Sequence, residues 1–376
     1  MRQGDQFTIS ARQIEYLDTW MNKVSRTFAV VVPAVEPPLQ YYLAIAYLIC
    51  RVVDNIEDCS QPHAWKIQRF SELELLLDEP QQASEILHTW ENEAWPGLSD
   101  DEEKIMGFAD GSPLWEIYST IPSESRAIIQ RWAKTMASGM SQLDDPQVQP
   151  HFITISDKQV LQDKQDYDDY CYIVAGTVGH MATELVSHHY GLSQPITDQL
   201  IRNAEACGRG LQKTNIIKDF AKDLQRGISY LNAEWMQEAD NKPLSLGGAP
   251  QHWIQIILDD VLADLDKATE YLLTLPADAV GYRKASLLCL LPAYQTLILA
   301  SEEKSKLFTP QHELKISHEK MAQCLQDTER LVLNNDGILD YSRSAKLEID
   351  QNLNLDSAIE IEEKSPLRSS FAGRGA

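Results

Sequence analysis

The sequence predicts an all-α protein folded as one large helical domain. Apolar residues recur at spacings of three and four along most of the chain, which is the period of a buried helix face. The alternating pattern of strands joined by hairpin turns is essentially absent. With 376 residues, 43% of them hydrophobic, the chain is long enough to bury a substantial core.

The helical pattern occurs in seven segments, which are separated by short stretches that disfavour helix formation. The segments are residues 14–24, 39–53, 128–140, 170–186, 200–220, 254–275 and 285–299. Stretches rich in proline, glycine and polar residues lie between them, at 36–38, 60–62, 95–100 and 241–250. Ser99 precedes an acidic stretch, "DDEEK", and is predicted to cap a helix that begins there. The apolar run 285–300 is too short to span a membrane and contains Pro292, so we expect a core helix.

The C-terminal part of the sequence differs from the rest in composition. After about residue 334 the chain turns polar and loses its periodicity, and such a segment can bury little apolar surface. We therefore predict one domain over residues 1–335 and a polar, mobile tail over residues 336–376.

The composition excludes several classes of partner. A formal net charge of -23 argues against nucleic acid, and against adsorption to anionic lipid through a basic surface. An anionic small substrate would need metal ions or a local basic patch to offset this charge. The six scattered cysteines form no CxxC pair, as expected of free thiols in a reducing compartment, and the N-terminus shows no secretory signal. We expect a soluble, cytoplasmic protein.

The stretch "RVVDNIED", residues 51–58, ends an apolar segment with carboxylates. Asp54, Glu57 and Asp58 stand at i, i+3 and i+4, so a helix places them on one face. Taken alone, such a face is most often simply solvated. Burying it without compensation would cost several kcal/mol per charge.

A second polar stripe lies in "LQKTNIIKDFAKDLQRG", residues 211–227. Gln212, Asn215, Asp219 and Asp223 follow one another at steps of three, four and four, with Lys213, Lys218 and Arg226 flanking them. Two carboxylate faces turned toward each other across a helical core would form an oxygen site suited to Mg²⁺. That ion takes one or two carboxylates and fills its other positions with water and phosphate oxygens. The pair of faces therefore predicts metal ions that hold a diphosphate.

Four motifs, in order, resemble the squalene/phytoene synthase family. They are "SRTFAVVVPAV", "YLICRVVDNIED", "YCYIVAGTVG" and "LQKTNIIKDFAKDLQRG", and the resemblance extends from about Ser25 to Gly227, more weakly to about Ile316. It implies an isoprenoid synthase fold, with helices around a deep apolar cavity and both acidic motifs at its mouth. It also implies condensation of two farnesyl diphosphates to presqualene diphosphate, Mg²⁺ (or Mn²⁺) as the metal, and reduction to squalene by NADPH.

The resemblance also implies roles for individual residues. Tyr170 matches a family tyrosine linked to proton removal when the cyclopropane closes; a plain rim tyrosine is the alternative. The implied metal-binding residues are Asp54, Glu57, Asp58, Asn215, Asp219 and Asp223. The implied diphosphate contacts are Ser25, Arg26, Arg51 and Lys218, with Gln212 and Asn215 orienting the substrate; Arg51 could instead pair with its acidic neighbours. The implied cavity residues are Phe28, Tyr47, Val174, Ala175, Gly176 and Leu185, for each of which core packing is the alternative. Gly176 and Gly179 also suggest close approach by substrate or by a neighbouring helix.

The C-terminal third departs from the family pattern. Leu288 stands where squalene synthases tend to have a phenylalanine, and Glu302-Glu303 stands in place of a segment linked to NADPH. Around Lys315 the text "LKIS" resembles the basic loop that follows, so Lys315 is the implied cofactor contact. In the second motif, Lys222 replaces a usual acid and Lys218 a usual arginine.

These departures leave alternatives open. The reaction could stop at presqualene diphosphate or give a dehydrosqualene- or phytoene-type product without NADPH. A non-catalytic prenyl-lipid binding protein is the alternative from another class. The membrane anchor of eukaryotic squalene synthases is absent, so we expect peripheral membrane contact for release of an apolar product. The sequence does not predict the substrate chain length, the pathway (hopanoid, sterol or carotenoid) or the oligomeric state.

Overall fold

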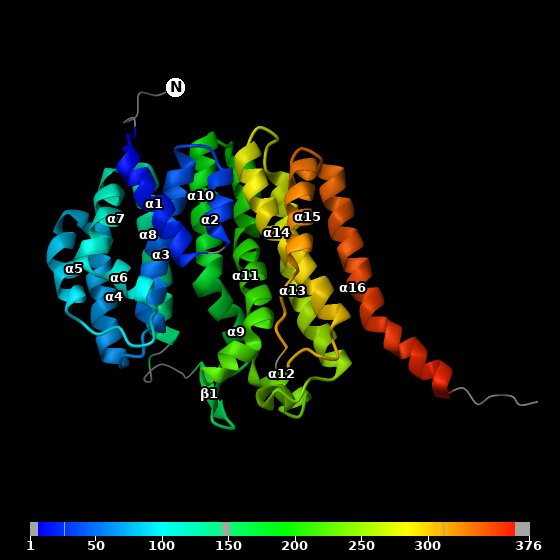
Figure 1. Cartoon of the computed structure of the whole chain (residues 1–376). Helices are drawn as coiled ribbons and strands as arrows, with labels where there is room; N and C mark the ends of the chain where they lie inside the picture. Colours follow the sequence, from blue (N-terminus) through cyan, green and yellow to red (C-terminus); the bar gives the residue numbers. More distant parts are fainter. Residues whose placement is uncertain (1–6, 26, 144, 146–150, 311, 365–376) are drawn as a thin grey trace, which may run out of the picture.

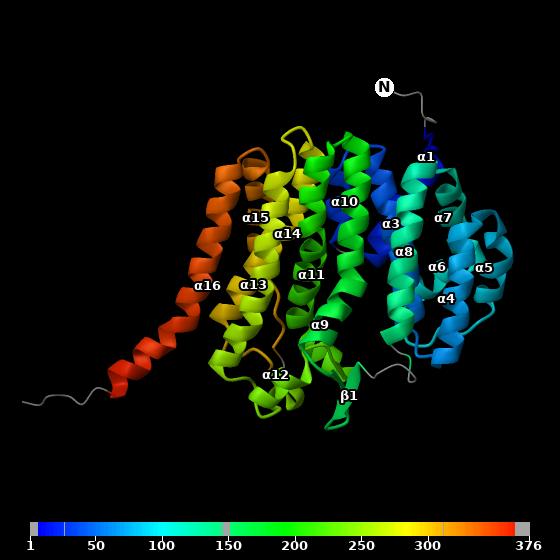
Figure 2. The same cartoon turned by 180° about the vertical axis from the view of Figure 1, so that it is seen from behind.

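The computed structural model describes residues 7–25, 27–143, 145, 151–310 and 312–364, with side chains described up to residue 354. Most helices run roughly parallel to one another, upright in the view of Figure 1. Helices α4–α7 form one side of the molecule and α13–α16 the other, with α3, α8, α10 and α11 between them (Figures 1 and 2).

The elements of the first half begin near the N-terminus and end with a β-hairpin. They are α1 (Ala11–Val24), α2 (Phe28–Val31), α3 (Leu39–Asp58), α4 (His63–Asp78), α5 (Ala83–Glu91), α6 (Asp100–Met106), α7 (Phe108–Thr120), α8 (Ser123–Leu143), β1 (Phe152–Ile155) and β2 (Lys158–Leu161). Ser99 caps α6: its hydroxyl accepts a hydrogen bond from the backbone of Glu102, whose carboxylate in turn accepts from the Ser99 backbone. The predicted cap is therefore confirmed.

The second half is also mostly helical. Its elements are α9 (Lys164–Cys171), a π-helical segment (Tyr172–Gly176), α10 (Thr177–Tyr190), α11 (Gln194–Gln225), β3 (Ile228–Ser229), α12 (Ala233–Glu238), α13 (Gln251–Thr274), α14 (Val280–Glu302), α15 (His318–Leu331) and α16 (Asn335–Lys364). Each predicted helical segment lies in helical structure, apart from Leu275, which follows α13. The all-α prediction is confirmed.

A small sheet lies at the lower end of the molecule in Figure 1. Strands β1 and β2 are antiparallel neighbours, and the two-residue β3 pairs with β2 in parallel. Strands of two to four residues are too short for an alternating pattern to be recognised, which is why the sequence did not predict them.

The prediction of a mobile tail from residue 336 is wrong for the residues through Leu353. Helix α16 packs against α13 and α14, and it buries Ile338, Ala345, Ile349 and Leu353. The hydroxyls of Tyr294 and Ser342 lie 2.8 Å apart across this contact. These buried residues are seven, four and four positions apart in an otherwise polar sequence. So few apolar positions give only a weak helical pattern, which is why the sequence did not predict the packing of this helix. Residues 365–376 of the predicted tail lie outside the described residues.

Helix α14 is the one described helix that is long and apolar enough to cross a membrane, and 67% of its most apolar window is buried inside the protein. It extends over 23 residues, so it is longer than the predicted segment 285–300. Its burial agrees with the predicted core helix. All six cysteines are free thiols, four of them buried, as predicted.

Candidate active site

The first acidic motif lies at the end of α3. The apolar face of this helix is buried through Ile56, which fixes the orientation of the carboxylates that follow. The Asp54 side chain is 23% exposed; its Oδ2 lies 3.6 Å from Arg51 Nη1, and its Oδ1 is buried without a hydrogen-bond partner among the described residues. Asp58, one turn later, is more exposed. Glu57 is partly buried, and its backbone carbonyl accepts a hydrogen bond from Lys66 at 2.5 Å.

The second motif lies near the end of α11, whose buried residues Ile216, Ile217, Phe220 and Leu224 turn the polar stripe outward from the core. Lys218 donates a hydrogen bond to Asn215 Oδ1 at 2.8 Å and lies 3.4 Å from Asp219 Oδ2. Asp223 follows one turn later and is partly buried.

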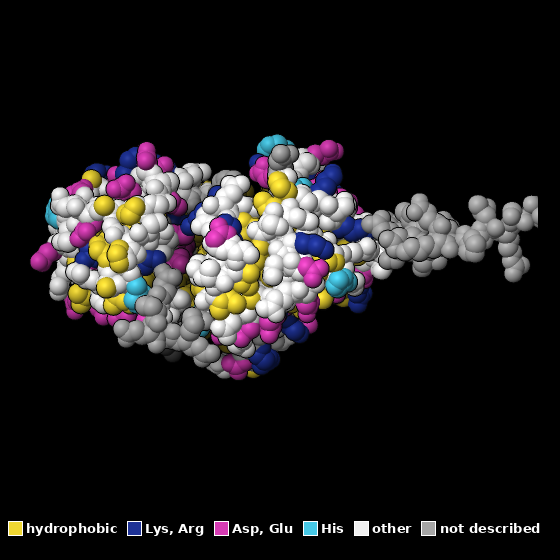
Figure 3. Space-filling model, turned by 90° about the horizontal axis from the view of Figure 1, so that it is seen from below, with side chains coloured by type: hydrophobic (Ala, Val, Ile, Leu, Met, Phe, Trp, Pro, Cys, Tyr) yellow, Lys and Arg dark blue, Asp and Glu magenta, His cyan; other side chains and the backbone are white. Residues whose placement is uncertain are grey.

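The two motifs converge at the lower end of the molecule, where α3 and α11 both end (Figure 1). Arg226, the first residue after α11, joins them, because its Nη2 donates a hydrogen bond to Asp58 Oδ1 at 2.9 Å. The view from below shows acidic side chains beside the hollow between the left-hand part of the molecule and its centre (Figure 3). The predicted convergence of two carboxylate-bearing helices is thus observed.

Two of these carboxylic acids have raised pKa values. Burial raises the pKa of Asp54 to about 6, against the opposing effect of the Arg51 guanidinium. Burial, followed by the charge of neighbouring Asp219, raises the pKa of Asp223 to about 6, and Asp58 adds to this shift. At both positions, the loss of solvation on burial outweighs the stabilisation that nearby basic side chains give to the charged carboxylate.

A cavity of about 340 Å³ opens between the motifs and extends into the core. This volume is in the range of small-molecule sites, about 300–1,000 Å³. Polar residues at one part of its lining are Tyr47, Arg51, Asp54, Gln212 and Asn215. The rest is mainly apolar and includes the predicted residues Phe28, Val174, Ala175 and Leu185. Residues that the sequence reasoning missed include Met136, Met181, Cys207, Tyr271, Tyr282 and Cys289; they lie on helix faces that sequence alone does not distinguish from ordinary core.

Close contact between α10 and α11 shapes one cavity wall. A Cβ on Gly179 would lie 2.1 Å from the Ala204 carbonyl oxygen, and one on Gly208 would lie 1.9 Å from the Ala175 carbonyl oxygen. Glycine is therefore required at both positions, and the predicted close approach at Gly179 is to a neighbouring helix. The π-helical segment, which carries Val174 and Ala175, lies at this contact; such segments often occur at functional sites.

We call the place where Asp54, Asp58, Asp219 and Asp223 meet the acidic mouth. Tyr170 lies next to it, near Glu57, and is not among the residues that line the cavity. Its ring stacks on Tyr230, with centroids 4.4 Å apart and planes 18° apart, and the two hydroxyls share a hydrogen bond. Burial raises the pKa of Tyr170 well above 10, and the Tyr230 phenol and the Glu57 carboxylate add to the shift. Sequence reasoning did not single out Tyr230; its position directly after the second motif was the signal that could have identified it.

The remaining predicted site residues lie in different surroundings. The Ser25 hydroxyl accepts a hydrogen bond from the Phe28 backbone at 2.9 Å and so supports the start of α2. Gly176 is buried beside the Tyr172 ring. Lys315 is exposed and does not line the cavity. Arg26 lies outside the described residues.

Of the C-terminal departures from the family pattern, Glu302 and Glu303 lie at the end of α14 and Leu288 lies within this helix. Glu303 lies 3.6 Å from His312 Nε2 and 3.7 Å from Lys306 Nζ. Leu288 is buried and is not in the cavity lining, although its neighbours Ser286 and Cys289 are.

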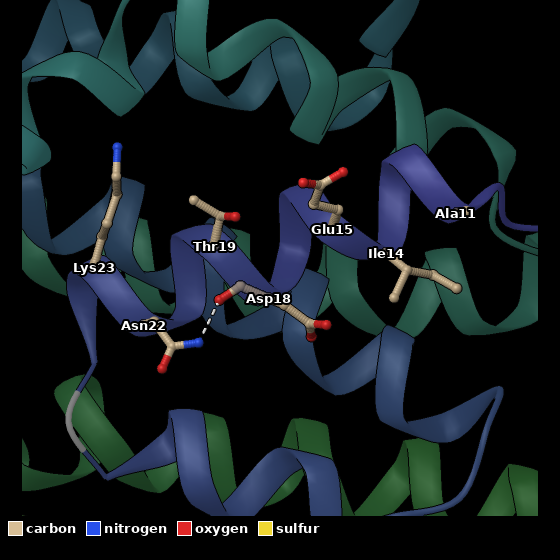
Figure 4. Close-up of a pocket in the computed structure, with 7 residues that line it drawn as sticks. All are labelled: Ala11, Ile14, Glu15, Asp18, Thr19, Asn22 and Lys23. Carbon is tan, nitrogen blue, oxygen red and sulfur yellow. Dashed lines mark hydrogen bonds between the residues drawn. The ribbon is translucent and has the colours of Figure 1, made fainter.

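A second hollow runs along the outer face of α1 (Figure 4). It is an open groove lined by Ala11, Ile14, Glu15, Asp18, Thr19, Asn22 and Lys23. None of the predicted site residues belongs to it. The central cavity is therefore the candidate active site.

The acidic mouth fits a hard divalent cation. Asp54 Oδ1 is a buried carboxylate oxygen without a hydrogen-bond partner, and Asp219, Asp223 and Asp58 lie on facing helix ends. Among the described residues, no three His, Cys, Asp or Glu side chains are close enough to enclose an ion by themselves.

Comparison with known proteins defines the class. The model of the squalene/phytoene synthase family matches residues 21–319, so the chain belongs to this family. The squalene synthase of Mus musculus is 27% identical over 220 residues, which are 58% of this chain and 45% of that protein. The chain thus spans about half the length of the curated relatives that it matches.

Two solved structures share the fold. A structure of TcSQS in complex with the ligand BPH1237 superposes with a TM-score of 0.71 at 20% identity, over 94% of this chain and 100% of that one. A crystal structure of a dehydrosqualene synthase with a ligand superposes with a TM-score of 0.56 at 18% identity, over 85% of this chain and 96% of that one. The chain therefore has the isoprenoid synthase fold that the resemblance implied.

Proposed function

We propose that this chain is a Mg²⁺-dependent farnesyltransferase that joins two molecules of farnesyl diphosphate head to head, forms presqualene diphosphate, and reduces it to squalene with NADPH. The observation that supports this proposal is the convergence of two carboxylate-bearing helix ends on an apolar cavity. A prenyl diphosphate has matching parts: a polar head that binds through cations at the mouth, and an apolar chain that fills the cavity. Family membership and the squalene synthase relatives support the same substrate class.

The carboxylates of Asp54, Asp58, Asp219 and Asp223 would hold the Mg²⁺ ions, with Glu57 and Asn215 as further ligands or orienting partners. Bound Mg²⁺ would neutralise the charge that develops on the departing diphosphate. Arg51 can add hydrogen bonds to the same group. Its guanidinium lies beside Asp54 and is held there by a hydrogen bond that it donates to the Tyr47 hydroxyl at 3.2 Å. Gln212 and Lys218 would orient the diphosphate from the facing helix.

The cavity walls would protect the reacting prenyl chains from water. Phe28 and Tyr47 lie with ring centroids 5.0 Å apart, and a ring face turned to the cavity would stabilise a nearby positive charge. Val174, Ala175 and Leu185 supply apolar wall from the opposite helices. Tyr170 would receive or relay the proton that is lost when the cyclopropane closes, since a weak base suffices for so acidic a hydrogen.

A second candidate is a family reaction without NADPH, ending at presqualene diphosphate or giving a dehydrosqualene-type product. The observation that favours it is at the end of α14, where Glu303 lies beside His312 and Lys306. A carboxylate at this position repels the phosphates of NADPH and already occupies the Lys306 ammonium, which could otherwise bind them. Lys315 remains the proposed dinucleotide contact if NADPH is used.

Product analysis tests these candidates. Purified protein is incubated with farnesyl diphosphate and Mg²⁺, with and without NADPH, and the extracted products are separated by mass. Squalene formed only with NADPH supports the full reaction; presqualene diphosphate or dehydrosqualene in both samples supports the second candidate. Unchanged substrate in every sample, including one with Mn²⁺ in place of Mg²⁺, would reject the enzyme.

The Asp54→Asn and Asp219→Asn variants separate an enzyme from a non-catalytic prenyl-lipid binder. In the proposed enzyme each loses turnover by at least about 100-fold, because a metal-binding charge is removed. A binder that needs no metal would keep its affinity for farnesyl diphosphate in both. We also propose a cytoplasmic location with peripheral membrane contact, through which the apolar product leaves.

A further inference from the structure

Basic side chains lie beside most of the carboxylates at the acidic mouth. Arg51 lies 3.6 Å from Asp54, Lys218 lies 3.4 Å from Asp219, and Arg226 lies 2.9 Å from Asp58. These cations stand where the proposed function requires Mg²⁺. Mg²⁺ on one of these carboxylates places a second positive charge beside the paired side chain, so metal binding weakens the pair by charge repulsion.

Arg226 differs from the other two because its ion pair joins the two motifs. Its side chain extends from the end of α11 to Asp58 at the end of α3 and is 52% exposed. Arg51, by contrast, is 23% exposed and is also held by the Tyr47 hydroxyl at 3.2 Å and by Glu102 at 4.0 Å. Among the described residues, Asp58 is the ion-pair partner of Arg226. Asp223 and Glu102 interact with the Arg226 charge over a longer distance, so the exposed side chain can move away from Asp58 at low cost while it stays in an acidic surrounding.

We propose that Arg226 exchanges partners: without metal it neutralises Asp58 and ties the two motifs together, and when Mg²⁺ binds Asp58 its guanidinium turns to the diphosphate. This inference rests on the proposed function. The charges support the exchange, because Mg²⁺ on Asp58 repels the guanidinium while a diphosphate on that metal attracts it. The guanidinium offers paired N–H donors that match phosphate oxygens. Arg226 would then be both the counter-ion of the empty site and a substrate-binding residue of the filled one.

The exchange predicts opposite effects of one substitution on two affinities. In Arg226→Gln, Mg²⁺ alone should bind up to about five times more tightly, because the ion no longer competes with an exposed guanidinium. With Mg²⁺ saturating, inorganic pyrophosphate should bind about 10-fold more weakly, because a charge-assisted hydrogen bond is lost. Isothermal titration calorimetry of the full chain measures both affinities without turnover.

Two further variants serve as controls. Lys222→Gln removes the same charge from the last turn of α11, where Lys222 is exposed and forms no ion pair with any described residue. Through charge alone, the affinity for Mg²⁺ should rise and that for pyrophosphate should fall, each by less than about threefold, because solvent and salt screen an exposed charge. Arg226→Lys keeps the charge but lacks the planar pair of donors, so its affinity for pyrophosphate should lie between those of the wild type and Arg226→Gln. Thermal unfolding confirms that each variant is folded.

The outcomes distinguish the exchange from the proposed function. If Arg226→Gln weakens both affinities together, Arg226 only supports the structure and the exchange is wrong. If it leaves both unchanged while the wild type binds Mg²⁺ and pyrophosphate, the exchange alone is overturned. If the wild type binds neither probe, the proposed function fails as well.

Discussion

At the scale of single residues, Tyr170 and Tyr230 form a stacked pair whose hydroxyls meet beside the acidic mouth. Because burial raises the pKa of Tyr170 well above 10, its side chain is a neutral phenol at neutral pH. It can therefore accept or relay a proton only through its hydrogen bonds. Tyr230 is the protein group that holds this hydroxyl in place, and its own charged neighbours include Glu57 and Asp58.

Removing the Tyr170 hydroxyl tests the proposed proton transfer. Tyr170→Phe keeps the ring stack, so the melting temperature should change little, while presqualene diphosphate formation should fall by about 100-fold or more, as for loss of a general acid–base group. Tyr230→Phe should cause a smaller loss, because it removes only the partner of the reacting hydroxyl. The initial rate with farnesyl diphosphate is measured at saturation. A Tyr170→Phe enzyme as fast as the wild type would exclude a role in proton transfer.

The raised pKa of Asp54 predicts how stability depends on pH in the metal-free protein. A carboxyl whose pKa rises from 3.8 to about 6 on folding stabilises the fold fully only below pH 3.8, and this stabilisation is lost as the pH rises through 6. The full shift corresponds to about 3 kcal/mol. In the presence of a chelator, the melting temperature should therefore rise between pH 7.5 and pH 5.5, and less so in Asp54→Asn. Equal slopes for the two proteins would contradict the shift.

At the scale of elements, a buried ion cluster joins α9, α11 and α13 behind the cavity. Lys213 is 2% exposed, and its Nζ lies 3.0 Å from Asp168, 2.8 Å from Asp260 and 2.8 Å from Asp264. Asp168 precedes Tyr170 by two residues, and Lys213 directly follows Gln212. The cluster therefore fixes the helix that carries Tyr170 against the helix that carries the second acidic motif.

Lys213→Met should destabilise the protein by about 3–5 kcal/mol, because it removes the buried cation that three carboxylates share and leaves them only Lys164 and Arg209 as partners among the described residues. Urea unfolding measures the loss. Lys222→Met, an exposed position on the same helix, should change stability by no more than about 0.5 kcal/mol. Combining Lys213→Met with Asp264→Asn should cost less than the sum of the single changes, since the Lys213–Asp264 pair can be lost only once. Additive costs would show that the cluster does not act as a unit.

Sequence periodicity was sufficient to predict the main helices and the two acidic faces, because a helix fixes which residues share a face within one or two turns. Asp54 and Asp58, or Asp219 and Asp223, are local pairs of this kind. Contacts between distant segments could not be predicted in this way. The burial of Lys213, which the sequence suggested only as a flanking basic residue, depends on carboxylates of α9 and α13. The π-helical segment depends on Gly208 in another helix.

At the scale of the whole molecule, the cavity lining comes from segments far apart in the chain, from Phe28 near the N-terminus to Leu290 on α14. The shape of the cavity therefore depends on how helices from both halves pack, and α14 is central to this. One side of α14 lines the cavity through Ala285 and Cys289, and α16 packs against the same helix. Arg283, which is 1% exposed, connects α14 to the start of α16, because its guanidinium donates a hydrogen bond to Asn335 at 2.6 Å.

A matched pair of substitutions on α16 tests whether this helix belongs to the folded core. Ile349 is fully buried, whereas Leu347, two residues earlier, is 58% exposed. Ile349→Ala should lower the free energy of unfolding by about 2–5 kcal/mol, as for a large aliphatic side chain removed from a packed core. Leu347→Ala should change it by no more than about 0.5 kcal/mol. Denaturant unfolding of both variants measures the difference, and a mobile segment would instead make both substitutions neutral. Because α16 supports the helix that lines the cavity, Ile349→Ala should also lower the temperature at which turnover is lost, by as much as it lowers the melting temperature.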